Sequence, residues 1–237
     1  MNILVIGASR GLGNTLALLL HQQGHQVWGM GRTSPASPSP FPFHYLQCDI
    51  TNRAQAYFSF QQLIPMPEVI VYCAGRAFDD ITEDAKNQNL LLPQLHKNFE
   101  LNCFGFLKTI DFFLPLYLKE KRGHFIYISS LSAIRENHRQ RIGYSSSKLA
   151  TNKILENLRM QYFCSNIKFT TVNFGRLHHR KHALIGINYQ KASKKIAHII
   201  CNYNRSNRCY YLPKLQTLLT YMTKFIPSRL YKKLMSK

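Results

Sequence analysis

Apolar residues along the chain fall in short continuous runs that alternate with stretches of helical periodicity. Runs such as 3–6 are typical of strands buried on both faces of a sheet. The repeat of Leu16, Leu19 and Leu20 is typical of a helix packed on such a sheet. The pattern predicts strands at 3–6, 26–30, 43–48, 68–72, 124–129, 167–173 and 208–212, and helices after Gly13 and at about 54–64, 93–121, 144–161 and 191–201.

This alternation predicts an α/β fold with a doubly wound, mostly parallel sheet. Parallel strands joined by helices cross over in the right-handed sense, and ligands bind at the carboxyl ends of the strands. We expect one domain over residues 1–212 and a basic amphipathic helical tail over 213–237. Residues 34–42 are rich in Ser and Pro and are expected to form an exposed loop.

A glycine-rich segment joins the first predicted strand to the first predicted helix. It contains Gly7, Gly11 and Gly13 in a GxxxGxG spacing, with Ser9, Arg10 and Leu12 between them. Backbone N–H groups at a helix N-terminus favour a phosphate, and glycines let a pyrophosphate approach closely. The segment therefore predicts a nucleotide phosphate site, and the competing interpretation is a purely structural turn.

The end of the second strand bears on the choice of nicotinamide cofactor. An acidic residue there would bind the ribose 2′-hydroxyl of NAD. The chain has Gly31, Arg32 and Thr33 instead, and its first acidic residue is Asp49. Because guanidinium groups suit a 2′-phosphate, Arg10 and Arg32 predict NADP(H). The alternative is that Arg32 is simply solvated.

The pair Tyr144 and Lys148 is a candidate acid/base motif. The YxxxK spacing occurs three times, also at Tyr117 and at Tyr210, but only Tyr144 follows a strand that ends in serines. Residues four apart share one face of a helix, so the lysine lies beside the phenol. A neighbouring cation favours phenolate, which makes tyrosine usable as an acid or base near neutral pH.

With these motifs in place, the chain resembles the short-chain dehydrogenase/reductase family from Asn2 to about Gly175. The segment from Gly7 to Gly13 is similar to the family's cofactor loop, and Tyr144 and Lys148 match its acid/base pair. Further matches follow in the family's order: Asp49 and Ile50 in the segment that contacts adenine, Ala74 and Gly75 beside the cofactor, Asn102 of the catalytic tetrad, Ser130 of the serine motif, and Gly175 in the segment lining the nicotinamide pocket.

The resemblance implies a Rossmann-type fold and an NADPH-dependent carbonyl reductase, or the reverse alcohol dehydrogenase, that forms dimers or tetramers. Tyr144 would pass a proton to or from the substrate oxygen, which Ser130 would hold by a hydrogen bond. Lys148 would tune Tyr144 and bind the ribose hydroxyls. Asn102 would hold a water that links Lys148 to solvent.

Two positions depart from the family pattern. Cys73 replaces the asparagine of the Asn-Ala-Gly motif, and Phe174 replaces the proline before Gly175. The following segment, 176–190, is short and basic. These departures bear on substrate geometry, and they support an alternative function: a catalytically weak, NADP(H)-binding regulatory or scaffold protein of the same fold.

Charge is distributed unevenly along the chain. The formal net charge is +20, and residues 157–237 contain 16 of the 31 lysines and arginines and no acidic residue. In the tail, apolar residues at 215, 218, 219, 222, 225 and 226 form a helical stripe that Pro227 interrupts, and a second short helix is expected from Leu230. This half of the chain could meet an anionic substrate, an anionic membrane surface, or its own core or another subunit. The tail could also cover the active site, where a bulky hydrophobic substrate would need shielding. Nucleic acid is disfavoured because no recognisable binding module is present.

The remaining features predict a cytoplasmic protein, with peripheral membrane contact left open. The N-terminus has no signal peptide, and no uninterrupted apolar run of membrane-spanning length occurs. The six cysteines lack metal-site spacing, which favours free thiols in a reducing compartment. The histidines at 178, 179 and 182 are expected to lie on a basic loop, and no metal is predicted.

Overall fold

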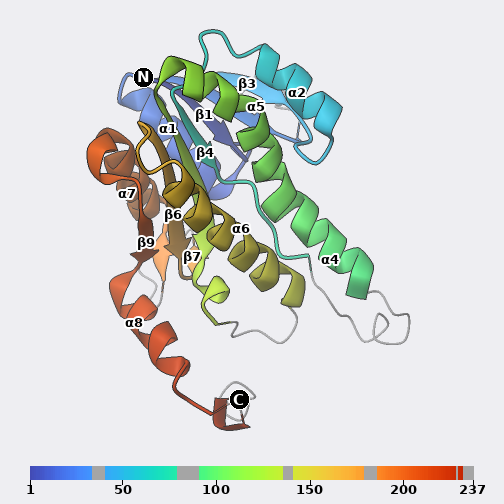
Figure 1. The fold of residues 1–237 in the computed structure, drawn as a ribbon, viewed down its shortest axis with the longest axis vertical. Helices are drawn as coiled ribbons and strands as arrows, with labels where there is room; N and C mark the ends of the chain where they lie inside the picture. Colours follow the sequence, from blue (N-terminus) through green and yellow to red (C-terminus); the bar gives the residue numbers. More distant parts are fainter. Residues whose placement is uncertain (34–40, 79–90, 136–140, 179–185, 228, 232–237) are drawn as a thin grey trace.

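A computed structural model describes residues 1–33, 41–78, 91–135, 141–178, 186–227 and 229–231. Seven parallel strands form one sheet in the order β3-β2-β1-β4-β5-β6-β9 (Figure 1). The predicted doubly wound parallel sheet is therefore confirmed. The strands are β1 (Asn2–Ile6), β2 (Gln26–Gly31), β3 (His44–Gln47), β4 (Val69–Tyr72), β5 (Gly123–Ser130), β6 (Ile167–Phe174) and β9 (Cys209–Leu212).

Strand β1 lies inside the sheet and pairs with β2 on one side and with β4 on the other. The chain first winds outward through β2 to β3, and then returns across β1 to continue through β4. The direction of winding thus reverses between β1 and β4. In open α/β sheets such a reversal leaves a crevice at the carboxyl ends of the strands.

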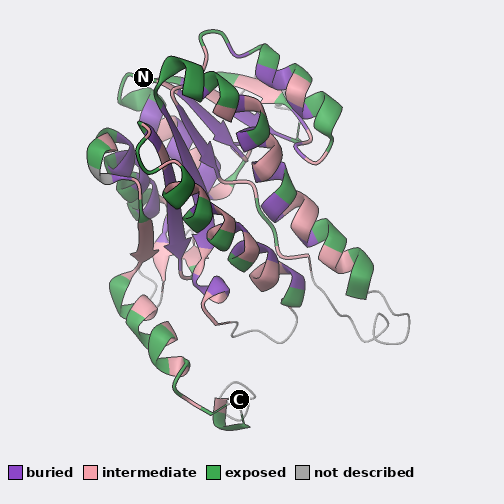
Figure 2. Ribbon diagram, viewed as in Figure 1, coloured by how far each residue is buried: buried purple, intermediate pink, exposed green. Residues whose placement is uncertain are grey.

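Helices cover both faces of the sheet (Figure 1). Alternate strand residues point to opposite faces, so each buried strand feeds two hydrophobic clusters. One cluster joins the sheet to α1 (Gly11–Gln22) and α7 (Tyr189–Cys201). The other joins it to α2 (Arg53–Gln61), α5 (Gly105–Glu120) and α6 (Ile142–Gln161). Figure 2 shows the sheet buried between these layers.

A long helical segment crosses the second face of the sheet. It comprises α4 (Leu91–Phe99), a π-helical turn η1 (Glu100–Phe104) and α5. By length and composition alone, Leu91–Glu120 is apolar enough to cross a membrane. Phe106, Phe113 and Tyr117 are, however, buried against the sheet, as in a core helix of a globular domain.

Sequence periodicity placed the larger elements within a few residues of their observed bounds. It missed the π turn, the 3₁₀ turns η2 (Leu131–Ala133) and η3 (Tyr203–Arg205), and the two-residue strands β7 (Leu177–His178) and β8 (Ile187–Asn188). These elements are too short to show a hydrophobic period. Most of the predicted loop at 34–42 lies outside the described residues.

The predicted tail begins as helix α8 (Lys214–Thr223), directly after the edge strand β9. None of its residues is buried, so its apolar stripe does not pack on the core of this chain. Of the second tail helix expected from Leu230, residues 229–231 are helical, and the rest lies outside the described residues.

Candidate active site

A cavity of about 1060 Å³ lies where the central strands end. It is lined by the residues that follow β1, β2, β3 and β4, together with residues from the end of β5 and from α6. Every residue predicted to bind the cofactor lines it except Gly175: Gly7, Ser9, Arg10, Gly11, Leu12, Gly13, Arg32, Asp49, Ile50, Ala74, Gly75, Tyr144 and Lys148.

Two glycines bring the backbone of the loop close to its neighbours. Gly7 has φ +91°, and a Cβ there would lie 2.5 Å from the backbone nitrogen of Ala74. A Cβ at Gly13 would lie 2.2 Å from the carbonyl oxygen of Gly7. Helix α1 begins at Gly11, has no side-chain cap from Arg10, and has no acidic residue in its first turn. Its first N–H groups are therefore available to an anion, and the glycine cradle fits a dinucleotide phosphate.

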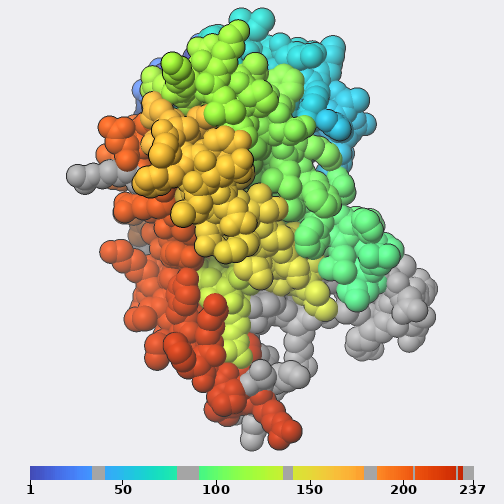
Figure 3. Space-filling view, in the orientation of Figure 1, coloured from blue at the N-terminus to red at the C-terminus, as the bar shows by residue number. Residues whose placement is uncertain are grey.

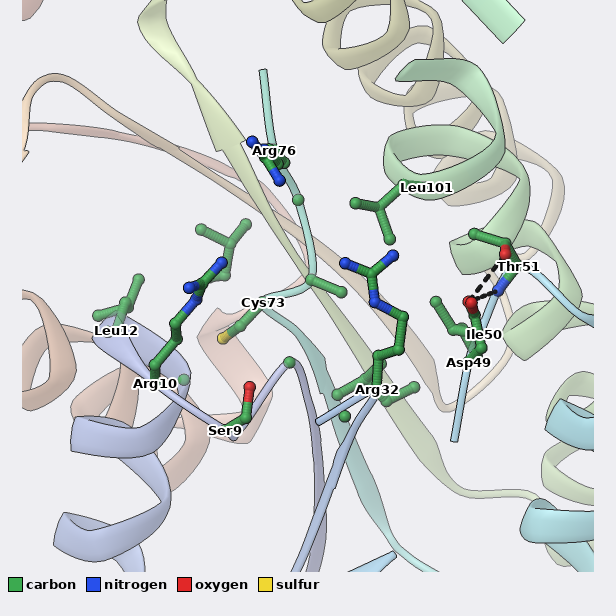
Figure 4. A pocket seen from close by; sticks show the side chains of 18 of the residues that line it. Ser9, Arg10, Leu12, Arg32, Asp49, Ile50, Thr51, Cys73, Arg76 and Leu101 are labelled. Carbon is green, nitrogen blue, oxygen red and sulfur yellow. Dashed lines mark hydrogen bonds between the residues drawn. The ribbon is translucent and has the colours of Figure 1, made fainter. Parts of the chain in front are cut away.

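Three arginines extend into this cavity from different elements. Figure 4 shows Arg10 from the glycine loop, Arg32 from the end of β2, and Arg76 from the segment after β4. Asp49 also lines the cavity, and its Oδ1 accepts hydrogen bonds from the backbone nitrogen of Thr51 at 3.0 Å and from its hydroxyl at 2.7 Å. The sequence analysis missed Arg76, although it directly follows the recognised Ala74-Gly75 pair.

Asn102 lies in the π turn and is fully buried. Its Oδ1 accepts from the backbone nitrogen of Arg76 at 3.0 Å, and its Nδ2 donates to the carbonyl of Arg76 at 3.1 Å and to Ser147 Oγ at 3.1 Å. The carbonyl of Asn102 accepts from the hydroxyl of Tyr127 at 2.5 Å. Asn102 thus connects the cofactor-side backbone after β4 to helix α6, and it lies behind the wall of the cavity.

Lys148 is buried beside Tyr144. Its Nζ donates to the carbonyl of Ile128 at 2.8 Å and lies 4.5 Å from the ring centre of Tyr127 and 5.8 Å from that of Tyr144. Burial lowers the pKa of Lys148 to about 7, because desolvation disfavours the ammonium form. A Cβ at Gly75 would lie 3.0 Å from this Nζ, so the glycine leaves room for the lysine.

The two departures from the family pattern lie on either side of this site. Cys73 lines the first cavity, and burial raises the pKa of its thiol to about 12, so the thiol stays neutral. Phe174 is buried at the end of β6. The next residue, Gly175, donates its backbone N–H to the carbonyl of Leu212 at 2.8 Å, which ties this segment to the edge strand.

A second cavity, of about 690 Å³, adjoins the first through Tyr144 and Ser129, which line both. Ser130 and Gly175 line only the second cavity. Ser130 Oγ accepts from the backbone nitrogen of Ser132 at 3.2 Å and from its hydroxyl at 2.9 Å, which leaves the Ser130 hydrogen for a ligand oxygen. Tyr144 therefore stands between the glycine-walled cavity and a cavity that contains a serine hydroxyl.

The second cavity is strongly basic. Arg135, Arg141 and Arg176 line it, and its described lining includes no acidic residue. The Nε of Arg141 is buried without a hydrogen-bond partner among the described residues. Gln216 and Thr220 of α8 complete one wall. The three arginines were not identified as site residues from the sequence, because their meeting depends on how separate segments fold together. That the tail could cover the site was left open, and Gln216 and Thr220 place part of it there.

The structure describes only part of the segment that contains the histidines at 178, 179 and 182. Of the three histidines, only His178 lies within the described residues. Within that part of the chain, no group of three or more metal-ligating side chains occurs.

Comparison with known proteins gives one family and a set of moderately similar relatives. Residues 1–180 match the family model described as short chain dehydrogenase. A 3-ketodihydrosphingosine reductase of Bacteroides thetaiotaomicron is 30% identical over 176 residues, which span 73% of this chain and 62% of the relative. An uncharacterised oxidoreductase of Staphylococcus aureus is 25% identical over 180 residues, which span 72% of this chain and 75% of the relative.

Solved structures share the fold at low sequence identity. Serine dehydrogenase from Escherichia coli superposes with a TM-score of 0.77 at 19% identity, covering 90% of this chain and 97% of that chain. A closed form of serine dehydrogenase complexed with NADP+ gives a TM-score of 0.76 at 18% identity, covering 90% of this chain and 94% of that chain.

Proposed function

The chain belongs to the short-chain dehydrogenase family, and from this premise we propose that it is an NADP(H)-dependent oxidoreductase acting on a carbonyl or alcohol substrate. The observation that carries the proposal is the position of Tyr144. It lines both the glycine-walled cavity and the cavity that contains Ser130, while Lys148 is buried beside its ring. A phenol in this position can exchange a proton with an oxygen while the carbon of the same substrate faces the cofactor.

A nicotinamide cofactor, when bound, would supply or accept the hydride, and the residues of this chain would hold and polarise the reactants. Ser130 donates a hydrogen bond to the substrate oxygen, and Tyr144 passes a proton to that oxygen or removes one from it. Protonated Lys148 favours the phenolate of Tyr144. Asn102 holds the backbone of Arg76 and the hydroxyl of Ser147, so it positions the cofactor wall relative to α6.

We assign the substrate to the second cavity, which we call the substrate cavity, and its lining favours a narrower class of substrate. Its three arginines and the absence of acidic residues from its described lining favour a carbonyl compound that also carries a carboxylate or phosphate. Arg141 is the strongest candidate for this contact, because its Nε is buried and has no partner among the described residues. An anionic group on the substrate would supply that partner.

The first prediction concerns the cofactor. NADPH should bind at least about tenfold more tightly than NADH, since charge-assisted hydrogen bonds contribute about 1.5–3 kcal/mol each. Arg32→Asp should narrow this difference, measured by fluorescence titration of both cofactors. Lys119→Asp is a matched control, because it makes the same charge change on an exposed residue outside the cavity. Equal affinities of the unaltered protein for the two cofactors would contradict the NADP(H) proposal.

The second prediction separates an enzyme from a scaffold of the same fold. Tyr144→Phe should lower turnover by at least about a hundredfold, the usual contribution of a positioned acid or base, while NADPH binding stays nearly unchanged. Tyr210→Phe changes the tyrosine of another YxxxK match and should retain turnover. Full activity in Tyr144→Phe would remove Tyr144 from the mechanism. Tight NADPH binding without turnover of any carbonyl by the unaltered protein would favour the scaffold.

The third prediction concerns the anionic group of the substrate. In a panel that pairs oxo acids with their methyl esters, the acids should show the higher kcat/KM. Arg141→Gln should reduce this preference by about tenfold or more, because the lost contact is charge-assisted. Arg122→Gln, which lies outside the cavity, should leave it unchanged. Equal kcat/KM for acids and esters would reject the anionic substrate class while leaving the oxidoreductase activity in place.

A further inference from the structure

Helix α8 and the turn that follows it present a row of apolar side chains to solvent. The row comprises Leu215, Leu218, Leu219, Met222 and Phe225, and we call it the outer row. Its exposed fractions run from 55% at Met222 to 82% at Phe225. In Figure 2, α8 has no buried segment along its length. Contiguous exposed apolar patches on folded domains commonly mark sites of interaction with a protein or a membrane.

The opposite side of α8 is polar and faces the catalytic domain. Gln216 Oε1 accepts from the backbone nitrogen of Arg176 at 3.3 Å, and a Cβ at Gly175 would lie 2.0 Å from the same oxygen. Gln216 and Thr220 also line the substrate cavity. Within the helix, the hydroxyl of Thr220 donates to the carbonyl of Gln216 at 2.8 Å. The polar groups on this inner side, which faces the domain, therefore have hydrogen-bond partners. The helix thus contacts the domain through its polar side, and its apolar side faces solvent.

Contacts at its C-terminal end hold the helix in this orientation. The guanidinium of Arg135 donates to the carbonyl oxygen of Thr223, and also to that of Ile226 at 3.3 Å. The same guanidinium lies 3.9 Å from the ring centre of Tyr231. Arg135 follows β5 and η2, so these contacts fasten the tail to the catalytic domain. Turning the outer row inward would break them.

Basic residues flank the outer row. Lys214 begins α8, and Lys224 and Arg229 follow its C-terminal end. The sequence continues with Lys232, Lys233 and Lys237, and no acidic residue occurs from 157 to the end of the chain. We propose that the outer row, together with Lys214, Lys224 and Arg229, forms a docking surface for an anionic lipid bilayer. The apolar side chains would enter the interface, and the cations would meet the anionic headgroups.

Charge also argues against a second copy of the chain as the occupant. In a two-fold dimer the same patch faces itself, so the lysines and Arg229 of two tails would be brought together. Like charges opposed at an interface cost free energy. An anionic bilayer supplies the opposite charge along the whole row.

Docking would place the catalytic cavity next to the lipid surface. Ser130 and Tyr144 line the cavity that Gln216 and Thr220 close from the inner side of α8. The outer row lies on the other side of the same helix, about 10 Å across. A substrate held in the headgroup region would therefore be close to the cavity that we assign to the reaction. The docking surface itself does not depend on the proposed activity.

The test is sedimentation of the full chain with vesicles. Vesicles of phosphatidylcholine containing about a third phosphatidylserine should retain the protein, and vesicles of pure phosphatidylcholine should not. The double variant Leu219→Ser and Phe225→Ser should lose at least about tenfold in apparent affinity, and raising the salt should weaken the binding of the unaltered protein. NADPH binding, measured in the same samples, should be the same for all variants.

The matched control is Met160→Ser with Phe163→Ser. These two side chains are each 74% exposed but lie before β6, at the opposite end of the sheet from α8. This control should bind the anionic vesicles like the unaltered protein. The proposal is overturned if the unaltered protein ignores the anionic vesicles, if both double variants lose binding equally, or if light scattering shows a dimer that only the α8 variant dissociates. A failure to reduce carbonyls would not affect any of these readings.

Discussion

The rest of the site depends on the close backbone contact between the glycine loop and the end of β4. Gly13 packs against the carbonyl of Gly7, and Gly7 packs against Ala74, with no room for a Cβ at either glycine. This contact fixes where α1 begins, and so aims its unpaired N–H groups into the cavity. It also fixes the position of the segment from Cys73 to Arg76, which forms the opposite wall. The phosphate site and the approach to Lys148 are therefore set by one packing constraint.

Burial of Lys148 connects this cofactor site to the chemistry. A lysine that is removed from water gives up hydration, which is why burial lowers the pKa of Lys148 to about 7. The carbonyl of Ile128 and the ring of Tyr127 partly compensate. An anionic cofactor in the same cavity would oppose the effect of burial and favour the ammonium form, which in turn would favour the phenolate of Tyr144. Under the proposed function, cofactor binding and activation of Tyr144 would thus be linked through one side chain.

Much of this arrangement is visible in the sequence, because strand runs, helical periods and glycine spacing are local signals. They predicted the sheet and the glycine loop, and the family resemblance added Asp49, Ile50, Ala74 and Gly75. All residues assigned to the cofactor line the first cavity except Gly175, which lines the second, whereas Arg76 was missed. Other features depend on contacts between distant segments. Periodicity shows that α8 is amphipathic, but it does not show which side of the helix contacts the domain. The hydrogen bonds of Gln216 and Arg135 determine that the polar side does. Similarly, Asn102 matched a family motif, but its contacts with Arg76 and Ser147 arise from the π turn.

The proposed function requires direct transfer of a hydride between nicotinamide C4 and a carbonyl carbon held beside Tyr144. It is tested most directly with NADPH carrying deuterium at both positions of nicotinamide C4, incubated with the protein and a reducible oxo acid. We expect an alcohol with deuterium on the carbinol carbon, formed as NADPH is consumed. An alcohol without deuterium at that carbon, or bound NADPH that is never oxidised by any carbonyl supplied, would contradict it.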